Sequence, residues 1–86
     1  MSTAHLLIGG NLGNRKENLL TAISLINEQC GSLIRSSSIY ETEAGGKTDQ
    51  PSFLNQALEI STSLNARQLM RTVLKVEKEM GRIREE

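Results

Sequence analysis

Strand-like and helix-like runs alternate along this chain. A short apolar run at residues 4–8 ends at two consecutive glycines and predicts a buried strand. Residues 33–41 predict a second strand, although three consecutive serines within them weaken the pattern. A loop at residues 45–51, rich in turn-forming residues, leads to a third predicted strand at residues 53–62.

The third predicted strand has two distinct faces, because alternate residues of a strand point in opposite directions. The apolar face comprises Leu54, Leu58 and Ile60. The opposite face comprises Phe53, Asn55 and Ala57. An aromatic ring and a carboxamide are therefore expected side by side, a pair that suits a flat, hydrogen-bonding heterocycle. The cost of burying an unpaired amide favours a binding site over plain core filling.

The first helix is predicted to begin at Asn14, with Glu17 three residues later in a capping-box arrangement. Its apolar positions recur at helical spacing and comprise Leu19, Leu20, Ile23, Ile26 and Cys30. Gly31 is the expected end of this helix.

The second helix is predicted to begin after Asn65, whose side chain caps it while Gln68 reaches back. Its apolar stripe comprises Leu69, Val73, Val76 and Met80. Gly81 is the expected end of this helix.

The resulting order β-α-β-β-α predicts an α+β fold in a single domain, residues 1–86. It resembles the ferredoxin-like βαββαβ arrangement, in which helices cover one face of the sheet. The final strand of that arrangement is missing, unless Ile83 and its neighbours begin it. We therefore expect a chain that is incomplete, or one that closes its sheet against a second copy by edge-strand pairing or a swapped dimer.

Composition narrows the classes of function. With 86 residues, of which only 2% are aromatic, one small core must be filled by aliphatic side chains and Met. Ten basic and ten acidic residues cancel, which argues against a generic nucleic-acid or anionic-membrane surface. The single cysteine, Cys30, fits a reducing compartment. No apolar run approaches the roughly 20 residues of a membrane span, and no secretory signal is evident, so we expect a soluble cytoplasmic domain.

The other chemistry-bearing residues give weaker signals. The glycine-rich stretch at residues 9–13 matches neither common phosphate-loop fingerprint, so a tight turn tied by Asn11 is the simpler interpretation. One His and one Cys supply no ligand cluster for zinc; His5 is expected in packing and Cys30 as a small buried residue. Thr42 either caps a turn or contacts a ligand.

Two arginines, Arg82 and Arg84, follow the predicted end of the second helix. On an extended, mobile loop their guanidinium groups would project the same way and bind phosphate oxygens bidentately. The alternative is a solvated, frayed terminus that Glu85 and Glu86 partly neutralise. Glu77 taken alone is typical of an exposed helix carboxylate.

Taken together, four stretches resemble the 6-hydroxymethyl-7,8-dihydropterin pyrophosphokinase family of folate biosynthesis. They are LIGGNLGNRKENL from Leu7, SSSIYETE from Ser36, DQPSFLNQALEI from Asp49 and VEKEMGRIR from Val76. Their order and spacing agree with the family over nearly all of the chain, and the DQPxFLN and ExxxGRxR patterns are the specific parts. The resemblance implies an enzyme that transfers a pyrophosphoryl group from ATP to the hydroxymethyl oxygen of the pterin and releases AMP, with Mg²⁺ as its cofactor.

The resemblance also implies site residues by match to these motifs. It assigns the pterin side to Thr42, Glu43, Gly45, Phe53 and Asn55. Phe53 would stack on the pterin and Asn55 would hydrogen-bond its edge, while the backbone of residues 43–46 frames the pocket. It assigns the nucleotide side to Glu77, Arg82 and Arg84. The two arginines would carry catalysis on a loop that closes over the phosphates.

Departures from the family pattern matter as well. Gly10 stands where the family commonly has Ser, and Ala44 and Gly45 stand where it has proline. The family's Arg-Trp-Gly-Pro-Arg-Thr segment and Asp-x-Asp magnesium site do not follow before the sequence ends at Glu86. We therefore expect no turnover by the isolated chain, an expectation that pterin-dependent AMP release would refute. The alternative to an enzyme is a non-catalytic ferredoxin-like module for small-ligand binding or assembly.

Overall fold

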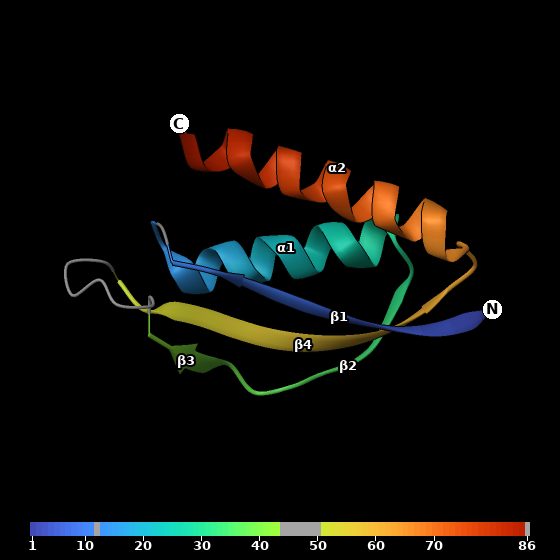
Figure 1. The fold of residues 1–86 in the computed structure, drawn as a ribbon, viewed down its shortest axis with the longest axis horizontal. Helices are drawn as coiled ribbons and strands as arrows, with labels where there is room; N and C mark the ends of the chain where they lie inside the picture. The colour runs from blue at the N-terminus through green and yellow to red at the C-terminus, as the bar shows by residue number, and fades with distance from the viewer. Residues whose placement is uncertain (12, 44–50, 86) are drawn as a thin grey trace.

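The computed structural model describes residues 1–11, 13–43 and 51–85, with the backbone alone for residues 81–85. In these ranges the elements are β1 (Ser2–Gly10), α1 (Arg15–Gln29), β2 (Ser32–Ser36), β3 (Tyr40–Thr42), β4 (Phe53–Thr62) and α2 (Ala66–Glu85). Both helices lie on the same face of one antiparallel sheet (Figure 1). The expected α+β class is therefore confirmed, and β4 has the bounds that the sequence predicted.

The central strand of the sheet is β4. It pairs along its length with β1, from Ser2 opposite Thr62 to Gly10 opposite Leu54. Its other edge pairs first with β3 and then with β2, both antiparallel to it. Since β1 and β2 are each antiparallel to β4, they run parallel to one another, and α1 connects them across the helix-covered face.

The second predicted strand is wrong in one respect, because it is divided into β2 and β3. The division falls in the serine run, where Ser37 uses its side chain in place of a regular ladder. Ala57 donates its backbone N–H to Ser37 Oγ at 2.9 Å, and Ser37 donates its own N–H to Ala57 O at 2.9 Å. Serine hydroxyls compete with backbone groups for such bonds, which interrupts regular pairing.

The first strand is longer than the sequence predicted, and this places the paired glycines differently. Gly9 and Gly10 belong to β1 and lie opposite Asn55 and Leu54, instead of forming the turn into α1. The turn comes later and includes Gly13, whose φ of 63° lies in the left-handed region that favours glycine.

The core lies between the sheet and the two helices. Its buried members are Ile26, Cys30, Leu58, Ile60, Val76 and Met80. The three apolar residues predicted for one face of β4 are all buried, and the stripe of α2 packs as expected. In α1 the prediction fails for Leu20, which is 67% exposed, because it lies one position beyond the buried Leu19 and points away from the sheet.

Both predicted helix starts are confirmed. Asn14 Oδ1 accepts from the N–H of Glu17 at 3.1 Å, and Asn14 Nδ2 donates to the Glu17 carboxylate at 3.0 Å. At α2 the bonds are reciprocal: Gln68 N–H donates to Asn65 Oδ1 at 2.9 Å, and Asn65 N–H donates to Gln68 Oε1 at 3.0 Å. These bonds satisfy amide groups that have no partner inside the helix.

The predicted end of α2 at Gly81 is wrong, because the helix continues to Glu85. A glycine inside a helix costs about 1 kcal/mol relative to alanine, a penalty that flanking helix formers can offset. Here Lys78 and Glu79 precede the glycine and Arg82 follows it, with no proline nearby. Arg82 and Arg84 therefore have helical backbones and do not lie on an extended loop.

Candidate functional site

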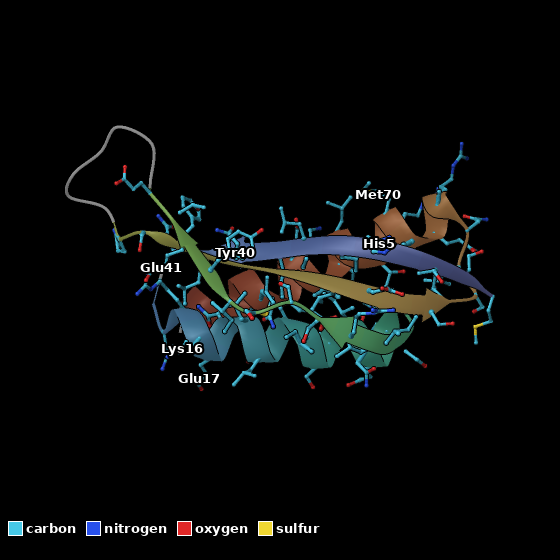
Figure 2. The ribbon with its side chains drawn as sticks, turned by 90° about the horizontal axis from the view of Figure 1, so that it is seen from below. His5, Lys16, Glu17, Tyr40, Glu41 and Met70 are labelled. Carbon is cyan, nitrogen blue, oxygen red and sulfur yellow. The ribbon has the colours of Figure 1, made fainter. Side chains whose placement is uncertain are left out.

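The helix-free face of the sheet carries the aromatic and amide pair that the sequence singled out. Figure 2 looks onto this face, with Tyr40 of β3 on the near side of the sheet and the helices behind it. Tyr40 lies opposite Asn55, and Thr42 lies opposite Phe53. Paired residues in an antiparallel sheet share a face, so all four side chains belong to this surface at one end of the sheet.

Asn55 is held by a hydrogen bond across the strands. Its Nδ2 donates to Thr42 Oγ1 at 2.9 Å. The carboxamide oxygen lies over Gly9, where a Cβ would come within 2.5 Å of Oδ1. The amide plane is thus fixed from both sides, and Oδ1 together with the second N–H of Nδ2 presents an acceptor and a donor next to the ring of Phe53.

A second group of polar side chains lies at the same end of the sheet but toward its helix-covered face, and the sequence analysis did not identify it. Arg15 Nη1 donates to Ser52 O at 2.8 Å and to Ser52 Oγ at 3.0 Å, and it lies 3.4 Å from Glu41 Oε2. Ser52 Oγ donates to the same carboxylate oxygen at 2.5 Å. We call Arg15, Glu41 and Ser52 the clasp. Sequence alone offered little signal for it, because its members come from three separate segments.

The electrostatics of the clasp favour the ionised carboxylate. The hydrogen bond from Ser52, followed by the hydrogen bond and charge of Arg15, lowers the pKa of Glu41, and Lys16 adds a smaller effect in the same direction. Nearby, Asn11 Nδ2 donates to Pro51 O at 3.3 Å. Asn11 therefore ties the residue after β1 to the segment before β4, rather than closing a turn within its own glycine-rich stretch as the sequence interpretation expected.

Glu77 lies on the other side of the sheet. It is exposed on α2 and borders a pocket of about 210 Å³ between the outer edge of β1 and the two helices. Gly9 and Gly10 border the same pocket, as do apolar side chains of both helices such as Val73. Glu77 is therefore not brought together with Phe53 and Asn55; the end of β1 lies between them.

Four further predicted residues are less informative. Glu43 is exposed just after β3. Gly45 lies outside the described residues. Arg82 and Arg84 are described by their backbone alone, so their assignment to phosphates stays a prediction.

The remaining titratable side chains have structural surroundings. His5 is exposed on β1, with its Nε2 3.8 Å from Glu59 Oε1, and Arg35 Nε lies 3.0 Å from the same oxygen. His5 thus sits on the sheet surface rather than in the core. Cys30 is buried as predicted, and burial raises the pKa of its thiol. Across the described ranges, no group of three or more His, Cys, Asp or Glu side chains is placed to hold a metal ion. None of the helices in these ranges is long and apolar enough to cross a membrane.

These features define an α+β fold whose helix-free sheet face carries a fixed carboxamide beside an aromatic side chain. A family model described as 7,8-dihydro-6-hydroxymethylpterin-pyrophosphokinase (HPPK) matches residues 5–86. The chain belongs to this family. The predicted resemblance is therefore confirmed.

Curated relatives agree with the family match. The chain is 41% identical over 83 residues to a 2-amino-4-hydroxy-6-hydroxymethyldihydropteridine pyrophosphokinase of Bacillus subtilis, covering 95% of this chain and 50% of the relative. It is 39% identical over 82 residues to the protein of the same name in Aquifex aeolicus, covering 95% and 51%. A folate synthesis bifunctional protein of Arabidopsis thaliana is 44% identical over 75 residues, covering 87% of this chain and 16% of the relative. The chain thus spans about half the length of the two pyrophosphokinases.

Proposed function

We propose that this chain supplies the pterin-binding side of a pyrophosphokinase that transfers a pyrophosphoryl group from ATP to 6-hydroxymethyl-7,8-dihydropterin. In this reaction the hydroxymethyl oxygen attacks the β-phosphorus of ATP and loses its proton. The bond from the β-phosphorus to the bridging oxygen of the α-phosphate breaks, and AMP leaves with that oxygen. Family membership and the geometry around Asn55 support the proposal.

The observation that carries the proposal is the fixed carboxamide beside an aromatic ring. Thr42 takes one N–H of Asn55, which leaves the other N–H and Oδ1 for a ligand. A pterin has a lactam edge with one N–H donor and one carbonyl acceptor, which complements that pair. Phe53 lies two positions away on the same strand face and offers a stacking surface. Because the amide is already oriented, little conformational entropy is lost on binding.

On the nucleotide side we propose Glu77, Arg82 and Arg84. Glu77 borders the pocket at the edge of β1, and the two arginines continue the same helix. The proposal includes the arginines as the groups that stabilise charge on the transferring phosphates, since guanidinium groups match phosphate oxygens. The proposal also includes Glu43 and Gly45 on the pterin side, of which Gly45 lies outside the described residues.

Magnesium is implied by the family, but the described residues do not form a fitting site. They include no cluster of carboxylates that could hold a cation against the β- and γ-phosphates. No step of the proposed reaction is therefore assigned to a metal ion here. The expectation that the isolated chain does not turn over stays a prediction.

Calorimetric titration with 6-hydroxymethyl-7,8-dihydropterin tests the proposal directly. We expect saturable binding by the wild-type chain and a loss of about tenfold or more in Asn55→Ala, because one polar pair to the ligand is removed. Ser61→Ala is the matched control, since Ser61 lies on the same face of β4 near its far end. Identical affinities for the wild type and Asn55→Ala, or no binding by either, would refute the pterin assignment.

The edge of β1 favours a second candidate, a module that assembles through its sheet. Among the described residues, β1 pairs only with β4, and the pocket along its other edge is lined by apolar side chains of both helices. On this reading the sheet completes a ferredoxin-like arrangement by pairing with a strand of a second copy. If the chain sediments as a dimer and does not bind the pterin, assembly is favoured over the pterin site.

A cytoplasmic location is part of the first proposal, the pterin pyrophosphokinase.

A further inference from the structure

The clasp joins three segments next to the proposed pterin site. Arg15 is the first residue of α1, Glu41 is the middle residue of β3, and Ser52 directly precedes β4. The residue after Glu41 is Thr42, and the residue after Ser52 is Phe53. Thr42 and Phe53 are opposite one another in the last pair between β3 and β4. Figure 2 shows Glu41 at the end of the sheet where α1 begins, near Lys16.

β3 needs support beyond its own ladder. It has three residues, all exposed, and within the described ranges it pairs with β4 alone, on one of its edges. Short edge strands open easily, because few backbone bonds and little buried apolar area hold them. Any such opening would move Thr42 and release the carboxamide of Asn55. Arg15, at the start of α1, bonds to Glu41 and Ser52 and so opposes this movement. Glu41 immediately precedes Thr42, and Ser52 immediately precedes Phe53.

The chemistry of Arg15 suits this task. Its guanidinium group is permanently charged and planar, and it reaches a backbone carbonyl, a hydroxyl and a carboxylate at once. The Arg15 side chain is 31% exposed, while that of Glu41 is 61% exposed. Exposed ion pairs contribute little to global stability. The clasp therefore acts on local geometry more than on the free energy of unfolding.

We propose that Arg15, Glu41 and Ser52 are positioning residues for the pterin site, because they hold β3 and the start of β4 in the register that orients Asn55. This inference rests on the proposed function for its ligand. None of the three touches the pterin in this scheme; they act through Thr42 and Phe53. The contact sequence runs from Arg15 to Glu41 and Ser52, and then along the chain to the hydrogen bond between Thr42 and Asn55.

The test uses Arg15→Gln and Glu41→Gln, with Arg35→Gln as the matched control. Arg35 also forms an ion pair on the sheet surface, with Glu59. Glu59 is paired with Arg35 in the sheet and lies toward the other end of β4 from Asn55. Each variant is characterised by its urea midpoint, by the NMR signal of the Asn55 side-chain amide without ligand, and by pterin affinity. The amide signal reports the bond to Thr42 directly, and a purely stabilising role would not move it in a fully folded variant.

We expect both clasp variants to lose about tenfold in pterin affinity, as supporting residues around a bound group typically do, and to shift the Asn55 amide signal. The Arg15→Gln/Glu41→Gln double variant should lose no more than the worse single variant, because both changes break one unit. Arg35→Gln should stay within about twofold of wild type.

Two outcomes would overturn the inference. The first is an unchanged Asn55 amide signal in folded Glu41→Gln, which removes an exposed carboxylate and is the variant least expected to disturb folding. The second is a loss of affinity that matches the control. If the wild-type chain binds no pterin, the proposed function fails, and the amide signals in the ligand-free variants still decide whether the clasp orients Asn55.

Discussion

Gly9→Ala tests the close approach between β1 and the carboxamide of Asn55. An added Cβ would lie 2.5 Å from Asn55 Oδ1 and 3.1 Å from Leu54 O. Ordinary contact begins at 3.4 Å, so the amide oxygen would have to retreat by about 0.9 Å. Because Nδ2 is attached to the same carbon as Oδ1, we expect this retreat to turn the amide and lengthen its 2.9 Å bond to Thr42 Oγ1. We therefore expect the variant to lose this bond as well as good packing.

The magnitude follows from these two effects. Loss of one hydrogen bond costs about 1 kcal/mol, and overpacking costs about 1–3 kcal/mol. Against them, alanine restricts the unfolded chain and returns about 0.4–1 kcal/mol. The expected net destabilisation is about 2 kcal/mol. For a domain of this size that lowers the urea midpoint by roughly 1–2 M, which far-ultraviolet circular dichroism can follow.

The decisive comparison is the same change in the Asn55→Ala background. In that background the carboxamide is gone, and the added Cβ meets only Leu54 O, at 3.1 Å. Gly9→Ala should then be close to neutral, so the two changes together should cost less than the sum of their separate costs. An equal cost of Gly9→Ala in both backgrounds would refute the view that Asn55 is what requires glycine at this position.

Three other changes probe stability elsewhere in the fold. Thr62→Val should cost about 1–3 kcal/mol in urea titrations, because buried Thr62 Oγ1 donates to Cys30 O at 2.6 Å; an unchanged midpoint would show that this bond is dispensable. Hydrogen bonds from Ser52 and Arg15 lower the pKa of Glu41 below 4.5, so its stabilisation is present above that value and lost as pH falls through the folded-state pKa. As pH falls from about 5 to about 3, the free energy of unfolding should therefore decrease less in Glu41→Gln than in the wild type. Parallel curves of unfolding free energy against pH for the two proteins would contradict this. Burial raises the pKa of the Cys30 thiol above 9.0, so its contribution to stability is complete below the unfolded-state pKa and is lost as pH rises through the folded-state pKa. Cys30→Ala should therefore flatten the decrease in unfolding free energy between about pH 8 and about pH 10. An equally steep decrease in the variant would contradict this.

Periodicity predicted the elements that depend on local chemistry. The bounds of β4 and both helix starts follow from patterns a few residues long, where alternation or a capping side chain decides the structure. The break between β2 and β3 could not be located in the same way. It depends on Ser37 bonding to Ala57, which lies 20 residues away in the chain.

The candidate site was predictable only in part, for a similar reason. Phe53 and Asn55 are two positions apart, so a strand pattern is enough to place them on one face. The clasp has no such local signature, since Arg15 and Ser52 are 37 residues apart. At Gly81 a local rule gave the wrong answer: glycine commonly ends helices, but the residues around it sustain α2 to Glu85.

The end of β1 connects the two halves of the proposed site. Gly9 touches the carboxamide of Asn55 on the helix-free face and borders the pocket that Glu77 lines on the helix side. Because Gly9 has no side chain, β1 adds little bulk at this position. In the proposed site, a pterin on the helix-free face would come nearest there to a nucleotide at the outer edge of β1. Gly9 then contributes space for the amide rather than part of a phosphate-binding loop. A Cβ at Gly9 should accordingly weaken pterin binding even in conditions where the variant remains fully folded.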